Sequence, residues 1–479
     1  MMSSSPAPRV DPAPPPLAVS TWALATFGGT DLGDRRRTAR LVQTATVLAA
    51  HPEQSLGRSL GEPAALKGAY RLLHNDATSV ETVTAAHRAQ TLETARAEPV
   101  VLLVQDTSDL DYRHHPATRE LSALGPGRPV GYLLQSVLAL RPPTPEAAGT
   151  VLGLAALEPY LRQPKPPGET RTERVQRPRE SDVWLRQVAA IGPPPPGGRW
   201  VHVGDRAADA MRFLQTVQTV QATGADLLVR VAQNRKITRD AAVPGYLLPQ
   251  ARSLPAGPER RVLTLPTRGG VRGRSVTLCV GWGATTVQPS WLRADQQVTA
   301  TPVPGWVLRV WEPAPPAETV PLEWILFTTV PTLTEADAWE RVGWYQQRWV
   351  VEEYHQALKT GCRLEASQLR DRDALWTLLG ICAPIAVRLL QLRSAARQTP
   401  DTPAETVFSP TTVQVVAALT HQPATGMTVR TCWRLIARLG GHLGRKGDGE
   451  PGWKTIWYGW QRVQDVETGV RLAASLPPP

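Results

Sequence analysis

Cysteine is scarce and scattered in this chain. Its four cysteines, Cys279, Cys362, Cys382 and Cys432, form no Cys-x2-Cys pair. This spacing argues against both a disulfide framework and a cysteine-based zinc site. The chain also lacks a GxxxxGK[ST] phosphate-binding loop, so we expect no ATP requirement.

Long apolar segments are lacking as well. The longest apolar run, 378–387, is interrupted by Pro384 and ended by Arg388. It falls well short of the roughly 20 residues that span a bilayer. The N-terminal stretch MMSSSPAPRVDPAPPP has no apolar core of the kind found in secretory signals. We therefore expect an intracellular protein without a membrane partner, with residues 1–18 as a disordered Pro-rich tail.

Positive charge is what the chain has in excess. It carries 53 basic and 42 acidic residues, a formal net charge of +11. Only six of the basic residues are lysine; genomic base composition accounts for most of this bias, but not for the net charge. Because arginine binds phosphate through a planar pair of donors, the composition favours a polyanionic partner such as nucleic acid.

The first part of the chain has the apolar spacing of helices. In TARLVQTATVLAA and EPAALKGAYRLLHND, apolar residues recur three and four apart. Asn75 and Asp76 end this pattern, and Ser79 is suited to cap a following helix. We therefore expect a small helical module over residues 19–78.

The pattern then changes to that of an α/β domain over residues 79–395. The run 100–104 is apolar throughout, as in a strand buried on both faces. Further strands are expected at 131–140, 151–156, 200–203 and 227–231, with a surface loop at 163–181 and an all-β insertion at about 237–330. Helices are expected at 336–360, 374–393, 429–439 and 453–468, the first as one long element and the last two in a C-terminal region over residues 396–479. Gly440 and Gly441 are expected to end the helix at 429–439.

Two aspartates follow predicted strands. Asp106 and Asp205 come just after the runs 100–104 and 200–203, where open α/β sheets carry their reacting groups. Taken singly, each is more often a turn or helix-capping residue. A third carboxylate strengthens the case for a site.

That carboxylate lies in the segment WYQQRWVVEEYHQALKTG. At about 100° per residue, Tyr345, Arg348, Glu352 and Lys359 fall within one stripe roughly 60° wide, and Glu353 lies off it. The alternative is a solvated helix face with ion pairs, but the surrounding residues are largely apolar. Three carboxylates brought together would hold two Mg²⁺ ions, or Mn²⁺ in their place, for phosphodiester cleavage.

These residues give the chain a resemblance to a known family. The pattern Tyr-x2-Arg-x3-Glu-x6-Lys, present here without a departure, resembles a subgroup of the DDE transposases of bacterial insertion sequences. Supporting segments are LGDRRRTARLV, KGAYRLLHND, VQDTSDLDYRHH, GDRAAD, PLEWILFTTVP, AVRLLQLR and IARLGGHL. The resemblance runs from about residue 22 to 472 and weakens between about 241 and 303.

The resemblance implies a fold, an activity and partners. It implies an RNase H-like mixed sheet with flanking helices, an N-terminal helical DNA-binding domain and a C-terminal dimerisation region. The implied enzyme is a bacterial, cytoplasmic and nucleoid-associated homodimer. It would cut its element out of double-stranded DNA through a hairpin intermediate and join the 3′ ends to target DNA.

The resemblance also implies roles for individual residues. The metal-binding triad falls on Asp106, Asp205 and Glu352. The residues implied to contact DNA near the active site are Tyr345, Arg348, Lys359, Trp324 and Arg230, with Trp324 stacking on a flipped base. Those implied to recognise the transposon ends are Arg36, Arg37 and Arg40.

Several other interpretations stay open. Trp324 fits a core position in a strand as well, and the arginines at 36–40 fit an exposed basic helix. The stripe Trp453, Trp457 and Trp460 favours a core or a subunit interface over a DNA contact.

Two alternatives concern the function as a whole. One is a DNA-binding repressor or inhibitor whose nuclease site is inactive. The other is a tyrosine recombinase, suggested by His442, Arg445 and Tyr458, although no arginine-bearing core upstream supports it.

Overall fold

The described part of the chain begins with helices. The computed structural model describes residues 19–145, 147–164, 166–170, 173, 177, 179–221, 225–238, 244–265, 273–289, 301–317, 319–398, 400–445, 448 and 450–475. The expected tail at 1–18 and parts of the expected loop at 163–181 lie outside these residues. The helical start is α1 (Val19–Phe27), α2 (Arg35–Ala50), α3 (Leu56–Leu60), α4 (Pro63–Leu73) and α5 (Val80–Arg96).

Side-chain caps explain where two of these helices begin. Asp34 precedes α2, and its Oδ1 accepts a hydrogen bond from the Arg36 amide at 2.8 Å. Ser79 precedes α5 in a reciprocal capping box with Thr82. The predicted cap at Ser79 is thus confirmed. Trp22 and Phe27 of α1 pack edge-to-face in the core of the module.

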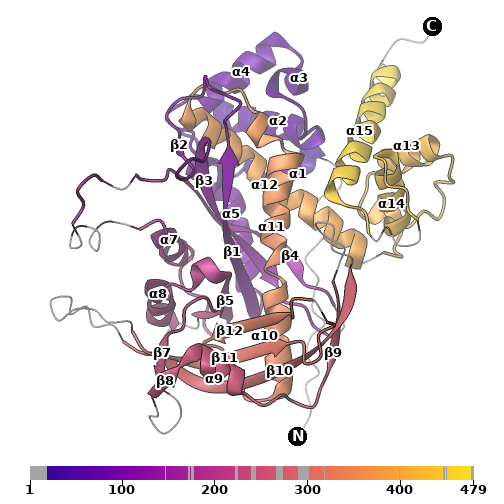
Figure 1. Ribbon diagram of the computed structural model, residues 1–479. Coiled ribbons are helices and arrows are strands. Elements are labelled where there is room, and N and C mark those ends of the chain that lie inside the picture. The colour runs from indigo at the N-terminus through magenta and orange to yellow at the C-terminus, as the bar shows by residue number, and fades with distance from the viewer. Residues whose placement is uncertain are drawn as a thin grey trace, which may run out of the picture.

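A mixed sheet forms the centre of the molecule (Figure 1). The strands that the chain contributes to it before residue 231 are β1 (Val100–Asp111), β2 (Ser122–Ala123), β3 (Val130–Arg141), β4 (Thr150–Tyr160), β5 (Arg199–Gly204) and β6 (Ala225–Arg230). The neighbours run in the order β4, β3, β1, β5, β6; the first three are antiparallel, and β5 and β6 lie parallel to β1. The strands predicted over 100–230 are confirmed.

Both faces of this sheet are covered, which explains the uninterrupted apolar run in β1. Val101 and Leu103 pack with Ala95 of α5 and with α7 (Asp182–Ile191). Leu102 and Val104 point to the other face and join the main core cluster. Because successive strand residues face opposite sides, a strand buried on both faces must be apolar at every position.

β1 is longer than its apolar run predicts. It continues through the mostly polar residues 105–111 to Asp111, so Asp106 lies within the strand and not after it. The extension is an antiparallel ladder with β3, in which Asp106 is paired with Ser136. Pairing with a distant strand therefore overrides the low strand propensity of these polar residues.

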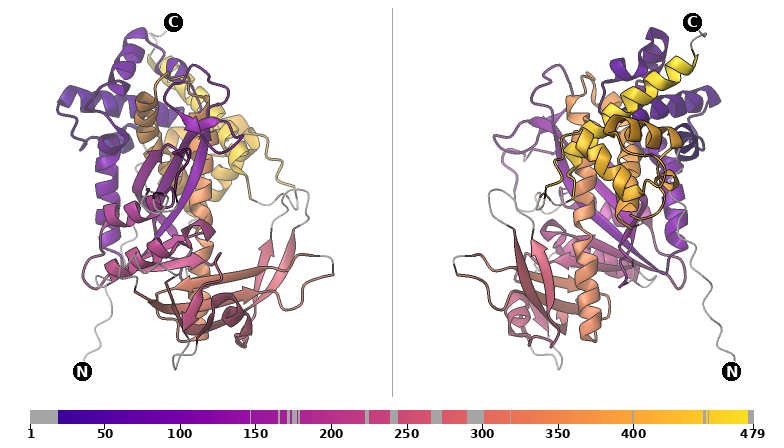
Figure 2. Two further views of the ribbon diagram at one scale, coloured as in Figure 1. Left: turned by 60° about the vertical axis from the view of Figure 1, so that its left-hand side comes forward. Right: turned by 90° about the vertical axis from the view of Figure 1, so that its right-hand side faces the viewer.

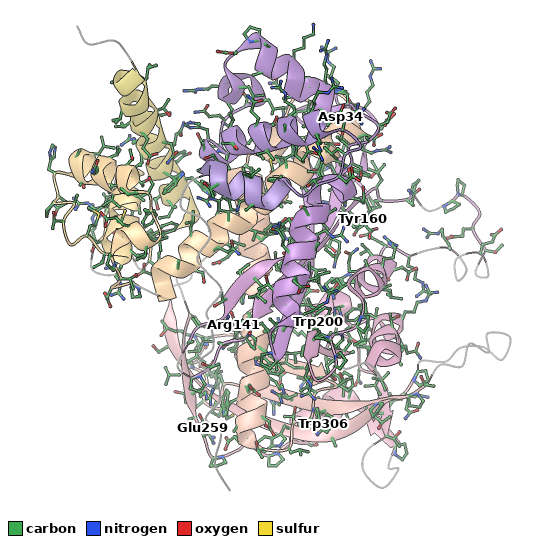
Figure 3. All side chains as sticks on the ribbon, turned by 180° about the vertical axis from the view of Figure 1, so that it is seen from behind. Asp34, Arg141, Tyr160, Trp200, Glu259 and Trp306 are labelled. Atoms are coloured by element: carbon green, nitrogen blue, oxygen red, sulfur yellow. The ribbon has the colours of Figure 1, made fainter. Side chains whose placement is uncertain are left out.

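The structure over residues 237–330 differs from the predicted all-β insertion in two ways. Its strands are β7 (Lys236–Thr238), β8 (Pro244–Tyr246), β9 (Arg261–Leu265), β10 (Arg274–Val287), β11 (Val303–Trp311) and β12 (Glu323–Thr328). It also contains α9 (Leu247–Ser253), so the prediction of an all-β insertion is wrong. β12 pairs with β6, which makes these strands an extension of the central sheet. Figure 3 shows Glu259 and Trp306 of this part at the opposite end of the molecule from Asp34 of the N-terminal helices.

The helix predicted at 336–360 is broken. It consists of α10 (Glu335–Gln346), α11 (Trp349–Gln356) and a π-type turn, Ala357–Gly361. Around Arg348, successive amides donate to carbonyls three residues back, the spacing of a 3₁₀ turn. The prediction of a single helix is therefore wrong. The sequence has no proline at the break, so the local pattern gives no sign of it.

The C-terminal helices complete the fold. They are α12 (Arg372–Gln398), α13 (Pro410–Thr420), α14 (Val429–Leu439) and α15 (Trp453–Ser475). The last three lie on one side of the molecule in Figure 1, and this side faces the viewer in the right-hand view of Figure 2. Among the described residues, α12 is the one helix long and apolar enough to span a membrane; 89% of that stretch is buried in the protein, as in a core helix.

The tryptophan stripe on α15 is used for packing where it is described. Trp457 is buried against Gly361, and Trp460 packs 6.0 Å from the Phe408 ring; the Trp453 side chain lies outside the described residues. α14 ends at Gly440 as predicted. A Cβ on Gly440 would lie 1.8 Å from the Thr455 carbonyl oxygen, so the crossing of α14 and α15 requires glycine there.

Candidate active site beside β1 and β5

Two aspartates are placed side by side by strand register. Val104 of β1 pairs with Val203 of β5, and Asp106 and Asp205 each lie two residues further on. Neighbouring strands are about 4.8 Å apart, so equivalent positions on them face the same way and lie close together. Asp205 also caps a short 3₁₀ turn, its Oδ1 accepting from the Ala207 amide at 2.8 Å.

Glu352 reaches the same place from α11, which packs on β1 and β3. The link is the buried guanidinium of Arg348. Its Nη1 lies 3.3 Å from Asp106 Oδ2, and its Nη2 donates to Glu352 Oε1 at 2.6 Å. The arginine therefore lies between the two carboxylates and partly neutralises both.

The carboxylates also interact electrostatically. The pKa of Asp106 is raised to about 7, mainly by burial and also by the charges of Asp205 and Glu352, whereas the Thr107 amide and Arg348 oppose the shift. Such a pKa indicates more negative charge than the site easily accommodates.

As the side chains stand, no three His, Cys, Asp or Glu groups among the described residues are close enough together to hold a metal ion. The donor set of Asp106, Asp205 and Glu352 nevertheless fits a hard divalent cation. It offers carboxylate oxygens only, and a dication would relieve their mutual repulsion.

An aromatic pair lies on one side of the carboxylates. The rings of Trp324 on β12 and Tyr345 on α10 are 5.8 Å apart in an edge-to-face arrangement. Burial raises the pKa of Tyr345, and the charges of Arg348 and Arg230 act in the opposite direction. Arg230, on β6, also donates to the Glu323 carbonyl at 3.4 Å. The aromatic pair is therefore next to two guanidinium groups.

A pocket of about 330 Å³ opens beside two of the carboxylates. Its lining residues are Asp106, Thr107, Ser108, Glu352, His355, Gln356, Lys359 and Thr360. The Lys359 ammonium lies 3.1 Å from Asp109 Oδ1 and 3.8 Å from Glu365 Oε1. The structure thus brings all four residues of the Tyr-Arg-Glu-Lys pattern to one edge of the sheet, with two of them lining this pocket.

Three stretches of the chain match transposase families. Residues 19–78 match a transposase DNA-binding domain, residues 203–387 a transposase DDE domain, and residues 384–477 the transposase Tn5 dimerisation domain. By its domains, the chain is a DDE transposase. The DDE match includes Asp205 and Glu352 but begins after Asp106, whose assignment rests on its place in the sequence and in the structure.

The solved structures that are similar to this transposase at a low level include one of another transposase. It is the "Cryo-EM structure of piggyBac transposase synaptic complex with hairpin DNA", with 10% sequence identity and a TM-score of 0.32. The match covers 83% of this chain and 59% of that chain. A similarity this weak carries no argument here. Tyr458 of the recombinase alternative lies within the dimerisation match, which leaves that alternative without support.

Glu353, the neighbour of Glu352, points to a different partner. Its Oε1 lies 2.7 Å from Nη1 of Arg393 on α12. The two adjacent glutamates of the transposase therefore have separate surroundings, one beside Asp106 and the other against the helix behind.

Asp209 is a site residue that the sequence reasoning missed. Its Oδ2 accepts from the amides of Ala232 and Gln233, both at 2.7 Å, and its Oδ1 accepts from Arg235 Nε at 2.8 Å. It ties the segment after Asp205 to the segment after Arg230. The only sequence signal is its place in GDRAAD, because its partners lie more than 20 residues away.

The three arginines expected to recognise transposon ends lie on α2 in different settings. Arg36 is exposed and paired with Asp34 at 3.0 Å. Arg37 is half-buried and donates to the Leu32 carbonyl at 2.9 Å, and Arg40 donates to Gln43 at 2.8 Å. Arg36 is the one of the three whose side chain is mostly exposed.

Proposed function

We propose that this transposase binds the terminal inverted repeats of its element, cuts the element out and joins the 3′ ends to target DNA. The observation that carries the proposal is the guanidinium of Arg348, which contacts both Asp106 and Glu352, together with the effect of the Asp205 charge on the pKa of Asp106. Such a set of carboxylates suits phosphodiester chemistry.

We infer an RNase H-like catalytic domain from the strand order. Three antiparallel strands followed by two parallel ones, β4, β3, β1, β5 and β6, support this assignment. The Tyr-x2-Arg-x3-Glu-x6-Lys pattern supports the corresponding subgroup, which includes the cut-and-paste enzyme of a composite kanamycin-resistance transposon. We keep the domain division 19–78, 79–395 and 396–479, with α12 crossing the last boundary.

Asp106, Asp205 and Glu352 would hold two Mg²⁺ ions, or Mn²⁺ in their place. When bound, such ions activate the attacking oxygen and stabilise the leaving oxygen. Arg348, no longer required between the carboxylates, would then pair with a backbone phosphate, as would Lys359. These two side chains would fix the scissile strand at the sheet edge.

The aromatic pair suits the hairpin stage. A first nick leaves a 3′-hydroxyl, which attacks the opposite strand to close a hairpin. A second hydrolysis releases the hydroxyl for attack on target DNA. Trp324 would receive the flipped base on its ring, and Tyr345 and Arg230 would hold the adjacent phosphates.

The remaining partners follow from the matched domains. The arginines of α2, Arg36, Arg37 and Arg40, would contact the inverted repeats. The C-terminal helices would join two copies into a homodimer in the synaptic complex, without ATP and in the bacterial cytoplasm at the nucleoid.

Cleavage of DNA that carries the gene's own flanking inverted repeats tests the proposal. With Mg²⁺, the wild type should nick the repeat ends and form hairpins. Glu352→Gln should bind the ends without cutting. Glu353→Gln, the matched control with the same loss of charge, should cut nearly normally because that carboxylate pairs with Arg393.

Two results would contradict the assignment. Residual cutting by Glu352→Gln would remove that residue from the triad, and an inactive Glu353→Gln would overturn the assignment of the two glutamates. End binding without cleavage by the wild type would favour the alternative, an inactive DNA-binding repressor derived from a transposase.

A further inference from the structure

Lys359 is engaged by an acidic residue outside the proposed triad. Its ammonium lies 3.1 Å from Asp109 Oδ1, on the same strand as Asp106, and both side chains are about a quarter to a third exposed. Carboxylate and phosphate oxygens are alternative acceptors for one ammonium group. A phosphate that approaches Lys359 therefore meets a competing anion already in contact with it.

Asp109 has a second cationic partner. Its other oxygen, Oδ2, pairs with Arg128, which lies just before β3. Burial opposes ionisation of Asp109, but the hydrogen bonds and charges of Lys359 and Arg128 prevail and lower its pKa. The carboxylate is thus charged and shared, and it keeps Arg128 as a partner if Lys359 moves away.

We propose that Asp109 is a positioning residue that holds Lys359 at the pocket and competes with a DNA phosphate for it. This inference rests on the proposed function, in which Lys359 binds a backbone phosphate. On binding, Lys359 passes from Asp109 to the phosphate, and Asp109 stays paired with Arg128. Asp109 therefore weakens binding of the scissile strand without touching the reacting atoms.

Asp111 provides a matched control on the same strand. It is two residues further along and pairs with Arg113, whose Nε donates to it at 2.6 Å, and makes no contact with Lys359 among the interactions described here. Asp109→Asn and Asp111→Asn remove the same charge from the same strand. Their difference isolates the contact with Lys359 from the general effect of charge on DNA binding.

The experiment is single-turnover nicking of end DNA by the full-length protein with Mg²⁺ at fixed salt. The variants are Asp109→Asn, Asp111→Asn, Lys359→Ala and the double variant Asp109→Asn/Lys359→Ala. Partly exposed ion pairs are weak, so Asp109→Asn should lower the half-saturating DNA concentration about two- to fivefold relative to Asp111→Asn. The maximal nicking rate should stay unchanged. In the Lys359→Ala background, Asp109→Asn should no longer lower the half-saturating DNA concentration.

Three results would overturn the inference. The first is an equal half-saturating DNA concentration for Asp109→Asn and Asp111→Asn. The second is a tighter half-saturation that persists in the Lys359→Ala background. The third is a lower maximal nicking rate in Asp109→Asn with an unchanged melting temperature. Lys359→Ala separates this failure from failure of the proposed function. If Lys359→Ala alone nicks with the wild-type half-saturating DNA concentration, Lys359 does not bind a phosphate. The inference about Asp109 is then also wrong.

Discussion

Removing the Asp209 carboxylate should destabilise the two segments that it joins beside the active site. Asp209 is nearly fully buried with Arg235, whose exposed side-chain fraction is 10%. It accepts two backbone amides and the guanidinium, and so joins the segment that carries Asp205 to the one that follows Arg230. Asp209→Ala removes all of these acceptors at once, while Asp209→Asn keeps one oxygen and loses the charge.

The size of the effect follows from burial. Leaving one member of a buried ion pair without its partner costs about 3–5 kcal/mol. The two amides that lose their acceptor are part of that cost, since such contributions do not add in one network. Asp209→Asn retains an acceptor for an amide, so it should cost less, about 1–3 kcal/mol.

Hydrogen exchange is the appropriate assay, because a protein of several domains does not unfold in one step. At 1.4 kcal/mol per factor of ten, Asp209→Ala should lower the protection of the Ala232 and Gln233 amides by a factor of about 10² to 4 × 10³. Amides of β1 serve as the internal reference. Nicking should slow in the same variant, because Asp205 and Arg230 lose their fixed relation.

Unchanged protection at Ala232 and Gln233 in Asp209→Ala would refute the reasoning about the buried pair. Lost protection with a normal nicking rate would refute the link to the active site. Asp209→Asn must fall between the wild type and Asp209→Ala; any other order would contradict the assignment of the cost to the missing acceptors.

Other expectations follow from the same structure. Trp324→Ala should nick normally but form few hairpins on a sequencing gel, and a normal hairpin yield would make Trp324 a core residue. EDTA should abolish nicking and leave end binding intact in a mobility-shift assay; cleavage in EDTA would remove the metal from the proposal. Arg36→Ala should weaken end binding and reduce its salt dependence, and an unchanged salt slope would mean that Arg36 contacts no phosphate. Burial lowers the pKa of His202 and His355 to about 3, so the unfolded chain binds protons first as pH falls. Stability around these rings should then decline by about 1.4 kcal/mol per pH unit for each histidine from pH 6.5 towards 3. Hydrogen exchange of β5 and α11, corrected for its intrinsic pH dependence, that shows no such decline would contradict the burial of these rings.

Local patterns in the sequence were sufficient for much of the fold. The apolar run 100–104 could be recognised as a buried strand, and Ser79 as a helix cap, because each depends on neighbours within a few residues. The arginine-rich composition indicated a polyanionic partner. The spacing of Tyr345 to Lys359 selected the residues that meet at the sheet edge.

Only the tertiary structure decided the features that depend on distant partners. β1 extends past Asp106 because β3 pairs with its polar half, and the insertion joins the main sheet because β12 pairs with β6. Arg348 lies between Asp106 and Glu352, although these carboxylates are more than 240 residues apart in the chain. Asp109 and Asp209 likewise acquire their roles from cations brought to them by other strands and loops. A window of neighbouring residues contains the propensity of a segment but not the identity of what will pack against it, and at this site the packing determines the charge balance.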